Sequence, residues 1–367
     1  MDDIRVAFWN LQNLFDSVPS EIAADLEFTP EKGWTEEAVE NKLNVLIEGV
    51  ATMFDGQGPD LFGICEIENR GLIERFVDLL NARLGRTDYT FAHEEAADLR
   101  GIDCSLIYSE DIFELAGEPE AHLVFLRFRT RDIFEVPLRV KESGAELVVF
   151  VNHWPSRSRN AVESEPYRIT VASHLARRVD ANLKLSRDEV VAAAADLGSI
   201  YEEMKTSWNR NVLILGDMND DPFNRSVLDE LTATNSLDKL EEELPEPGSS
   251  ADAIETYLRR KAVLYNLSWK SVGVPGEGTI FFSRNTVRTK QIFDQIIVSR
   301  GLLLGQQGLS VDLDSWSIHT PTVLLTNTGL PADAALHRVR PKKFEPPNGR
   351  GASDHFPVLC KLRTAGA

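Results

Sequence analysis

One segment, Asn211-Val-Leu-Ile-Leu-Gly-Asp217-Met-Asn219-Asp220-Asp221, carries most of the information about the architecture. Its four apolar residues, Val212 to Leu215, run without a polar interruption, which is typical of a strand buried on both faces but also of a short buried helix. We expect Gly216 to permit a tight turn, after which Asp217 and Asn219, two residues apart, point the same way. An acid and an amide at the mouth of a buried strand suit a metal, a water or a phosphate, although both are also ordinary turn residues.

Composition places the chain among soluble globular proteins. Its 367 residues suffice for a large core in one or two domains, and 43% of them are hydrophobic and 26% charged. No apolar run approaches the length of a membrane span. The acidic start, Met1-Asp2-Asp3, has neither the basic nor the apolar region of a signal peptide. We therefore expect a cytoplasmic protein, with an exported form as the alternative, and we expect a monomer.

Charge and cysteine usage narrow the classes of partner. The net charge of −19 argues against a broad basic surface that grips nucleic acid non-specifically, although a local basic groove is compatible with it. The three cysteines, Cys65, Cys104 and Cys360, lie in apolar, strand-like surroundings. An odd and sparse set is no disulfide framework, so we expect buried free thiols that bind no metal.

Apolar patterning divides the chain into short strands and a few helices. One helix is expected to begin near Thr35, a second to run from about Gly71 to Leu84, and a long helical region to lie between Pro166 and Asn209. Strand patterns recur at residues 4–9, 61–65, 89–92, 104–108, 122–129, 134–140, 147–152, 212–215, 279–282, 292–298 and 356–362.

This mixture of elements, without regular βα alternation, favours the α/β (α+β) class. The expected architecture is a four-layer sandwich, in which two packed mixed β-sheets are flanked by helices. We interpret residues 1–367 as a single domain with inserts at 17–34, 157–209, 238–256 and 316–350. The last insert is rich in Pro and Gly, so we expect a long loop or an irregular segment there.

Polar groups suited to phosphate or metal chemistry stand at the ends of several expected strands, where α/β proteins commonly build their sites. Each one alone has an ordinary explanation: Glu66 as a solvated turn acid, His153 as a satisfied histidine, and Asp354-His355 as a structural pair. Asp294 is harder to explain in this way, because a nearly buried acid needs a partner. Arg157 is either a surface charge or a phosphate ligand.

Taken in order, six short segments resemble the endonuclease/exonuclease/phosphatase superfamily, which includes pancreatic deoxyribonuclease, abasic-site endonucleases, sphingomyelinases and inositol polyphosphate 5-phosphatases. Gly-Asp-Met-Asn and Ser-Asp-His are specific together and weak alone. The Asn-His-Trp-Pro-Ser-Arg form is most similar to bacterial members known as generic nucleases or phosphatases. The segments span nearly the whole chain: Phe8-Trp9-Asn10, Cys65-Glu66, Asn152-His153-Trp154-Pro155, Gly216-Asp217-Met218-Asn219-Asp220, Phe293-Asp294-Gln295 and Ser353-Asp354-His355.

The resemblance implies one acidic metal site and phosphoester hydrolysis. It makes Glu66 the principal ligand of Mg²⁺ (or Mn²⁺), with Asn10 beside it and Asp354 as a further acid on the metal side. Mg²⁺ prefers oxygen ligands and keeps several waters, so one or two carboxylates with the substrate phosphate suffice.

The resemblance also implies catalytic roles. Asp217 orients or deprotonates the attacking water, and Asn219 holds phosphate or metal. His355 contacts the scissile phosphate and is positioned by Asp294, an arrangement that raises the pKa of the imidazole and favours its cation. His153 falls where relatives carry a His or Tyr that assists the leaving group or stabilises the phosphate.

Substrate contacts are expected from Asn152, Arg157 and Arg100, with Asp103 as the alternative to Arg100 at the border of the site. The leading hypothesis is a metal-dependent phosphodiesterase of the nuclease type, acting on DNA or RNA. Its rival, favoured by the acidic charge, hydrolyses a small phosphoester such as an inositol phosphate, a nucleotide or a lipid headgroup. A catalytically silent binding module is the remaining alternative, although every catalytic group carried over from the resemblance is present.

Overall fold

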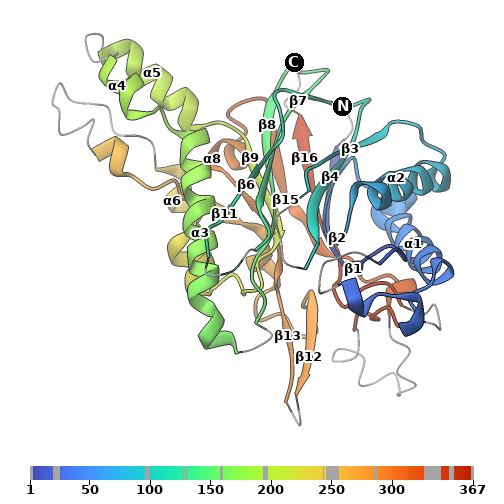
Figure 1. The fold of residues 1–367 in the computed structure, drawn as a ribbon. Helices are drawn as coiled ribbons and strands as arrows, with labels where there is room; N and C mark the ends of the chain where they lie inside the picture. Colours follow the sequence, from blue (N-terminus) through green and yellow to red (C-terminus); the bar gives the residue numbers. More distant parts are fainter. Residues whose placement is uncertain are drawn as a thin grey trace.

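The computed structural model describes residues 3–19, 25–95, 100–126, 128, 130–157, 160–192, 197–242, 244, 256–284, 287–325, 340–346 and 351–364. Two β-sheets pack face to face in its centre, and helices cover their outer faces (Figure 1). The expected sandwich of two mixed sheets flanked by helices is confirmed, with six strands in one sheet and eight in the other. Within the described ranges, no helix is long and apolar enough to cross a membrane.

The first sheet is built around the N-terminal strand β1. The order of its strands is β15-β16-β1-β2-β4-β3, and β1 pairs parallel with β2 but antiparallel with β16. Every residue of β2 is buried, as its uninterrupted apolar run predicts. The bounds are β1 Ile4–Leu14, β2 Leu61–Ile67, β3 Tyr89–His93, β4 Asp103–Ser109, β15 Leu309–Ile318 and β16 Val358–Thr364.

The second sheet has the segment Val212–Asp217, strand β9, near its middle. The order is β10-β11-β14-β9-β8-β7-β5, with β6 paired to β7, and β9 lies parallel to β8 but antiparallel to β14. The bounds of the others are β5 Phe113–Leu115, β6 Glu120–His122, β7 Ile133–Val140, β8 Glu146–His153, β10 Ala233–Thr234, β11 Leu264–Asn266 and β14 Asp294–Val298. The whole of β9 is buried, so the strand interpretation of its apolar run holds.

Helices α1 and α2 cover the first sheet, and α3 with α5 covers the second, on opposite sides of the molecule in Figure 1. Thr35 caps α1 by accepting the N–H of Ala38, and Asn69 caps α2 by accepting the N–H of Leu72, so both helices begin where short polar residues satisfy free backbone donors. The bounds are α1 Glu36–Val50, α2 Arg70–Leu84, α3 Ala161–Leu183, α4 Arg187–Ala192, α5 Leu197–Trp208, α6 Leu237–Glu241 and α8 Arg300–Leu304.

Three apolar clusters follow from these four layers. One fills the space between the sheets, one lies between the first sheet and α1 with α2, and one lies between the second sheet and α3 with α5. Cys65, Cys104 and Cys360 are buried free thiols, as their apolar surroundings predict.

Two expectations about individual elements are corrected, and the strand expected at 279–282 is present. The strand expected at 122–129 is not found in its described part, because β6 ends at His122 and Leu123 and Phe125 are exposed; residues 127 and 129 lie outside the described ranges. Trp316, the expected start of an insert, belongs to β15 and is buried. The strand at 279–282 is half of a hairpin, β12 Ile280–Arg284 with β13 Val287–Gln291, that projects beyond the sheets in Figure 1.

Candidate active site

The carboxyl ends of β1 and β2 in one sheet face the carboxyl ends of β8 and β9 in the other. The side-chain nitrogen of Asn10 donates to Asp217 Oδ2 at 3.0 Å and to Glu66 Oε1 at 3.3 Å. Across the same space, His153 Nε2 lies 3.5 Å from Glu66 Oε1 and 3.7 Å from Asp217 Oδ2. Four buried polar side chains from four strands thus converge at one edge of the sandwich.

Strand alternation explains which residues reach this edge. Leu213 and Leu215 face the core between the sheets, and Asp217 continues their row, so its carboxylate emerges at the mouth of that core. Gly216 lies within β9 and makes no tight turn, which corrects the expectation from sequence. A Cβ at Gly216 would lie 2.7 Å from the backbone oxygen of Asn152, so only glycine lets β8 and β9 approach this closely.

Backbone strain concentrates at the same edge. Seven non-glycine residues of the described chain have a positive φ, and four of them are here: Gln12 (53°), Asn13 (52°), Glu66 (65°) and Asn219 (48°). The pairing of β2 with β4 shifts register at Glu66, which is a bulge of the kind that re-aims a side chain. Such positions cost on the order of 1–3 kcal/mol each and persist at functional sites because the surrounding structure holds them.

The pairing of β1 with β2 also shifts register between Asn10 and Leu14, and the backbone of this irregular segment holds Glu66 in place. The N–H of Asn13 donates to Glu66 Oε2 at 2.7 Å. Beneath it, the fully buried ammonium group of Lys42 donates to the carbonyl oxygens of Gln12 and Asn13. Burial lowers the pKa of Lys42 to about 7. Sequence reasoning missed Lys42, because a lone lysine on a helix is normally a surface charge.

His355 and Asp294 form a direct, buried hydrogen bond. His355 Nδ1 lies 2.7 Å from Asp294 Oδ2, and His355 Nε2 lies 3.8 Å from Asp217 Oδ2. Burial alone would lower the pKa of His355, but the charges of Asp294 and Asp217 and the hydrogen bond to Asp294 raise it well above its ordinary value. The imidazole is therefore a buried cation at neutral pH.

The pKa of Asp217 is raised as well, which for a carboxyl group favours the neutral form. Burial raises its pKa to about 7, helped by the charge of Asp294 and opposed by the cation of His355. The N–H of Asn219 donates to Asp217 Oδ1 at 2.9 Å, and the Asn219 side-chain nitrogen donates to the carbonyl of Trp154 at 3.0 Å. Asn219 therefore orients Asp217, and Asp217 exchanges a proton near neutral pH.

His153 is held by an arginine that sequence reasoning missed. Arg131 Nε donates to His153 Nδ1 at 3.2 Å, and Arg131 Nη2 lies 2.9 Å from His153 Nε2. Burial, together with the charges of Arg131 and Arg100, keeps the pKa of His153 well below its ordinary value, so this ring is neutral. The available signal was position: Arg131 precedes β7, which is antiparallel to β8 and so starts where β8 ends.

The three predicted substrate contacts have different surroundings. Arg100 lies at the site, where Nη1 is 3.8 Å from Glu66 Oε1 and Nη2 donates to Asn13 Oδ1. Asn152 is buried on the face of β8 opposite His153, and its side-chain oxygen and nitrogen have no hydrogen-bond partner among the described residues. Arg157 donates to Asp220 Oδ1 at 3.0 Å and to the Asn219 carbonyl at 2.8 Å, as an internal brace beside the site.

A model of the endonuclease/exonuclease/phosphatase family matches residues 5–246, which is more than half of the chain. The chain belongs to this family. As a member of the endonuclease/exonuclease/phosphatase family it is a phosphoester hydrolase. No curated protein matches it by sequence.

Solved structures of endonuclease/exonuclease/phosphatase fold are similar over nearly the whole chain. A family protein from Bacteroides thetaiotaomicron is 15% identical, with a TM-score of 0.52 and coverage of 100% of this chain and 98% of that one. TDP2 from D. rerio, complexed with a single-strand DNA product, is 13% identical, with a TM-score of 0.51 and coverage of 99% and 100%. A mannosyl-6-phosphatase of Bacteroides thetaiotaomicron is 15% identical, with a TM-score of 0.50 and coverage of 98% and 99%.

The family typically uses a divalent metal, and the residues at this edge fit such an ion. Burial and the neighbouring charge of Glu66 raise the pKa of Asp354, against the opposing charge of His355, whose Nε2 lies 4.0 Å from Asp354 Oδ1. Burial also raises the pKa of Glu66, but the cations of Arg100, Arg131 and His355 outweigh it and keep Glu66 ionised. Oxygen-rich donor sets of this kind suit Mg²⁺ or Mn²⁺.

Asp217, Asp294 and His355 also have one ligand atom each within 4.8 Å of the others. A metal is not needed to explain that cluster. The 2.7 Å contact between His355 Nδ1 and Asp294 is a direct hydrogen bond, which leaves Nε2, 3.8 Å from Asp217 Oδ2, as the ring nitrogen available to an ion.

Proposed function

We propose that this endonuclease/exonuclease/phosphatase family member is a divalent-metal-dependent phosphodiesterase of the nuclease type. The proposal rests on one observation: a buried carboxyl group with a pKa near 7, Asp217, lies 3.8 Å from a buried imidazolium, His355. Proton acceptance by the first and charge stabilisation by the second are the two tasks in the attack of water on a phosphoester.

Asp217 is the group that orients the attacking water and takes its proton. Asn10 and the backbone of Asn219 donate hydrogen bonds to its two oxygens, so the carboxylate is fixed before substrate arrives. His355, held by Asp294, offers Nε2 to the oxygens of the scissile phosphate, where negative charge grows in the transition state. His153, neutral and held by Arg131, is placed to assist the leaving oxygen or the phosphate.

Glu66 and Asp354 are the carboxylates that would hold the divalent ion, and Asn10 keeps Glu66 beside Asp217. When bound, such an ion supplies Lewis-acid stabilisation of the phosphate oxygens. Arg100 and Arg131 add positive charge on the side of the site that Glu66 and His153 occupy, and we assign them to binding the phosphate.

A diester is favoured by the balance of charge at the site. A phosphodiester carries one negative charge, and the cations of His355, Arg100 and Arg131 are partly offset by Glu66, so a singly charged phosphate is easier to receive than a doubly charged one. The TDP2 structure with a single-strand DNA product shows a protein of this fold with DNA. The second candidate is a small-molecule phosphoesterase, since the net charge of −19 repels polynucleotides and a mannosyl-6-phosphatase shares the fold.

A substrate panel tests the proposal. Supercoiled plasmid, single-stranded DNA, RNA, bis-p-nitrophenyl phosphate, p-nitrophenyl phosphate, inositol phosphates and sugar phosphates would be incubated with the full chain in Mg²⁺ or Mn²⁺, with and without EDTA. Metal-dependent cleavage of polynucleotides and of the diester supports the proposal. Turnover of small monoesters with none of any diester selects the second candidate, and turnover that survives EDTA overturns both.

A further inference from the structure

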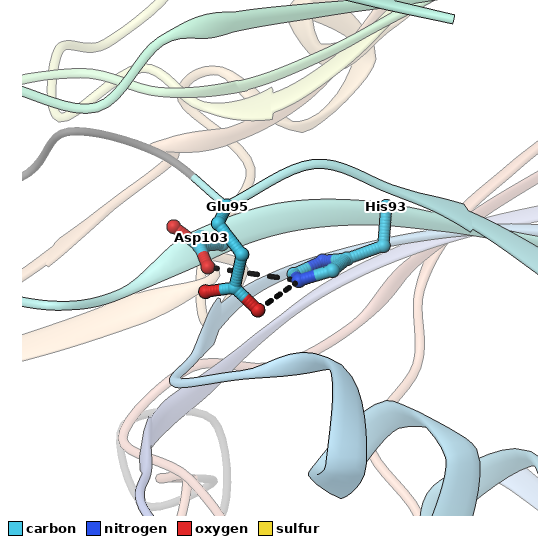
Figure 2. A group of neighbouring side chains, drawn as sticks. All are labelled: His93, Glu95 and Asp103. Atoms are coloured by element: carbon cyan, nitrogen blue, oxygen red, sulfur yellow. Dashed lines mark hydrogen bonds and ion pairs between the residues drawn. The ribbon is translucent and has the colours of Figure 1, made fainter.

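A second group of potential metal ligands lies at the same end of the first sheet, on the two strands next to the one that carries Glu66. His93 is the last residue of β3, Asp103 is the first residue of β4, and Glu95 lies two residues beyond His93. Figure 2 shows the two carboxylates converging on one nitrogen of the His93 ring. Asp103 neighbours Cys104, whose side chain faces the core between the sheets, so the cluster lies on the other face of the sheet, away from the active site.

The distances in this cluster match the edges of a metal coordination shell. His93 Nε2 lies 3.3 Å from Glu95 Oε1 and 3.7 Å from Asp103 Oδ2, and the three ligand atoms all lie within 4.8 Å of one another. The 3.3 Å contact is a long hydrogen bond, and the 3.7 Å contact exceeds hydrogen-bond length. In a tetrahedral site with metal–ligand bonds of about 2.1 Å, ligand atoms lie about 3.4 Å apart.

The other ring nitrogen is already committed. His93 Nδ1 lies 2.8 Å from the hydroxyl of Ser105, the next residue on the same face of β4 as Asp103. A second partner of this kind fixes the orientation of a metal-binding imidazole and directs its free nitrogen at the ion. The side chains of His93 and Asp103 are 1% and 2% exposed, whereas that of Glu95 is 61% exposed and leaves a route from solvent.

We propose that His93, Glu95 and Asp103 bind one divalent transition-metal ion, Zn²⁺ or Mn²⁺. One imidazole with two carboxylates suits these ions, whereas Mg²⁺ prefers oxygen alone and Ca²⁺ needs more oxygen ligands. The ion joins both ends of the connection between β3 and β4, which carries Arg100 toward Glu66. The site therefore has a structural role that is separate from the ion at Glu66 and does not rest on the proposed reaction.

His122 supplies a matched comparison, because it is also a histidine with two glutamates. Its Nε2 lies 2.6 Å from Glu135 Oε2, which is a direct hydrogen bond, and Arg178 lies 2.9 Å from the same oxygen. A cation already neutralises Glu135, and the short contact leaves no room for an ion. We therefore expect His122 to bind no metal.

The test counts tightly bound ions on the full chain. Protein stripped with a chelator would be equilibrated with Zn²⁺ or Mn²⁺ in a large excess of Mg²⁺, which competes for the oxygen ligands of the active site. Unbound metal is removed, bound metal is measured by elemental mass spectrometry, and the melting temperature is recorded with and without Zn²⁺. Wild type and the His122→Gln control are expected to retain a single ion and to gain thermal stability.

The variants separate loss of a ligand from loss of the fold. His93→Gln is expected to lose the ion, and Glu95→Gln, at an exposed position, to keep the stability of the stripped protein while its affinity for Zn²⁺ falls by at least about tenfold. Equal retention by wild type and both variants overturns the site, as does failure of wild type to retain Zn²⁺ or Mn²⁺. Neither result depends on catalysis, so failure of the proposed phosphodiesterase activity would be recognised separately.

Discussion

Replacing Asp294 by Asn removes the charge that keeps His355 protonated while hardly changing the volume of the side chain. The contact that changes is the buried 2.7 Å hydrogen bond between His355 Nδ1 and Asp294 Oδ2. A hydrogen bond to a charged group contributes about 1.5–3 kcal/mol. Because Asp294 contributes both a charge and this hydrogen bond to the raised pKa of His355, that pKa should fall in Asp294→Asn.

The same free energy sets the expected loss of rate. If the imidazolium stabilises the transition state through this contact, losing about 1.5–3 kcal/mol lowers kcat/KM by about 10- to 100-fold at pH 8. The loss shrinks as the pH falls, because the cation of His355 is then restored by protons from solution. Loss of the Asp294 charge also lowers the pKa of Asp217, so Asp217 remains a base at lower pH. This change too makes the loss of rate smaller as the pH falls.

The assay is the pH profile of kcat/KM for bis-p-nitrophenyl phosphate from pH 5.5 to 9, taken as the ratio of Asp294→Asn to wild type. Nitrogen NMR of the histidines reports the titration of His355 directly in the same two proteins. The ratio is expected to rise as the pH falls, together with a lowered pKa of His355. A ratio that stays constant across the range, with His355 titrating as in wild type, would refute the assignment of Asp294 as the group that maintains the cation.

Three further perturbations address the residues around this pair. Arg131→Gln should lower kcat/KM by about 10- to 100-fold and move the pKa of His153 back toward its ordinary value; an unmoved His153 titration contradicts the contact. Asp220→Asn leaves Arg168 and Arg157 without their buried carboxylate partner, so urea denaturation should show a loss of about 3–5 kcal/mol, and a loss below about 1 kcal/mol argues against the brace. The pKa of Lys42 is about 7 in the folded protein and about 10.5 in the unfolded chain, so between these values the unfolded chain binds more protons than the folded one. The free energy of unfolding therefore rises with pH over that range. That rise should be missing from Lys42→Met in urea denaturation at pH 7 to 10, and an identical pH dependence in both proteins contradicts the buried amine.

The strand ends were the part of the site that could be predicted from sequence. Asn10, Glu66, His153 and Asp217 each follow an apolar run, and parallel strands carry the ends of such runs to one edge. Distant segments such as Asp294 and Ser353-Asp354-His355 were placed by the resemblance. The structure brings all of them together, and the family membership and the sandwich fold are confirmed.

The sequence did not predict the face of the sheet on which each side chain lies, or the residues that each side chain contacts. Asn152 and His153 are adjacent in sequence, yet strand alternation sends their side chains to opposite faces of β8. Arg157 pairs with Asp220 because the two loops meet in space, which no spacing in the sequence reveals. Arg131 and Lys42 belong to no motif, and only the folded chain shows which carbonyls and rings they contact.

Asp217 as the base of a metal-dependent reaction is the central claim, and one measurement tests it most directly. The rate of bis-p-nitrophenyl phosphate hydrolysis in Mg²⁺ would be compared for wild type, Asp217→Asn and the exposed control Asp229→Asn, each with and without EDTA. We predict that EDTA abolishes turnover, that Asp229→Asn matches wild type, and that Asp217→Asn loses at least about 100-fold, in line with the size of general base catalysis. Wild-type turnover by a folded Asp217→Asn protein would contradict the account.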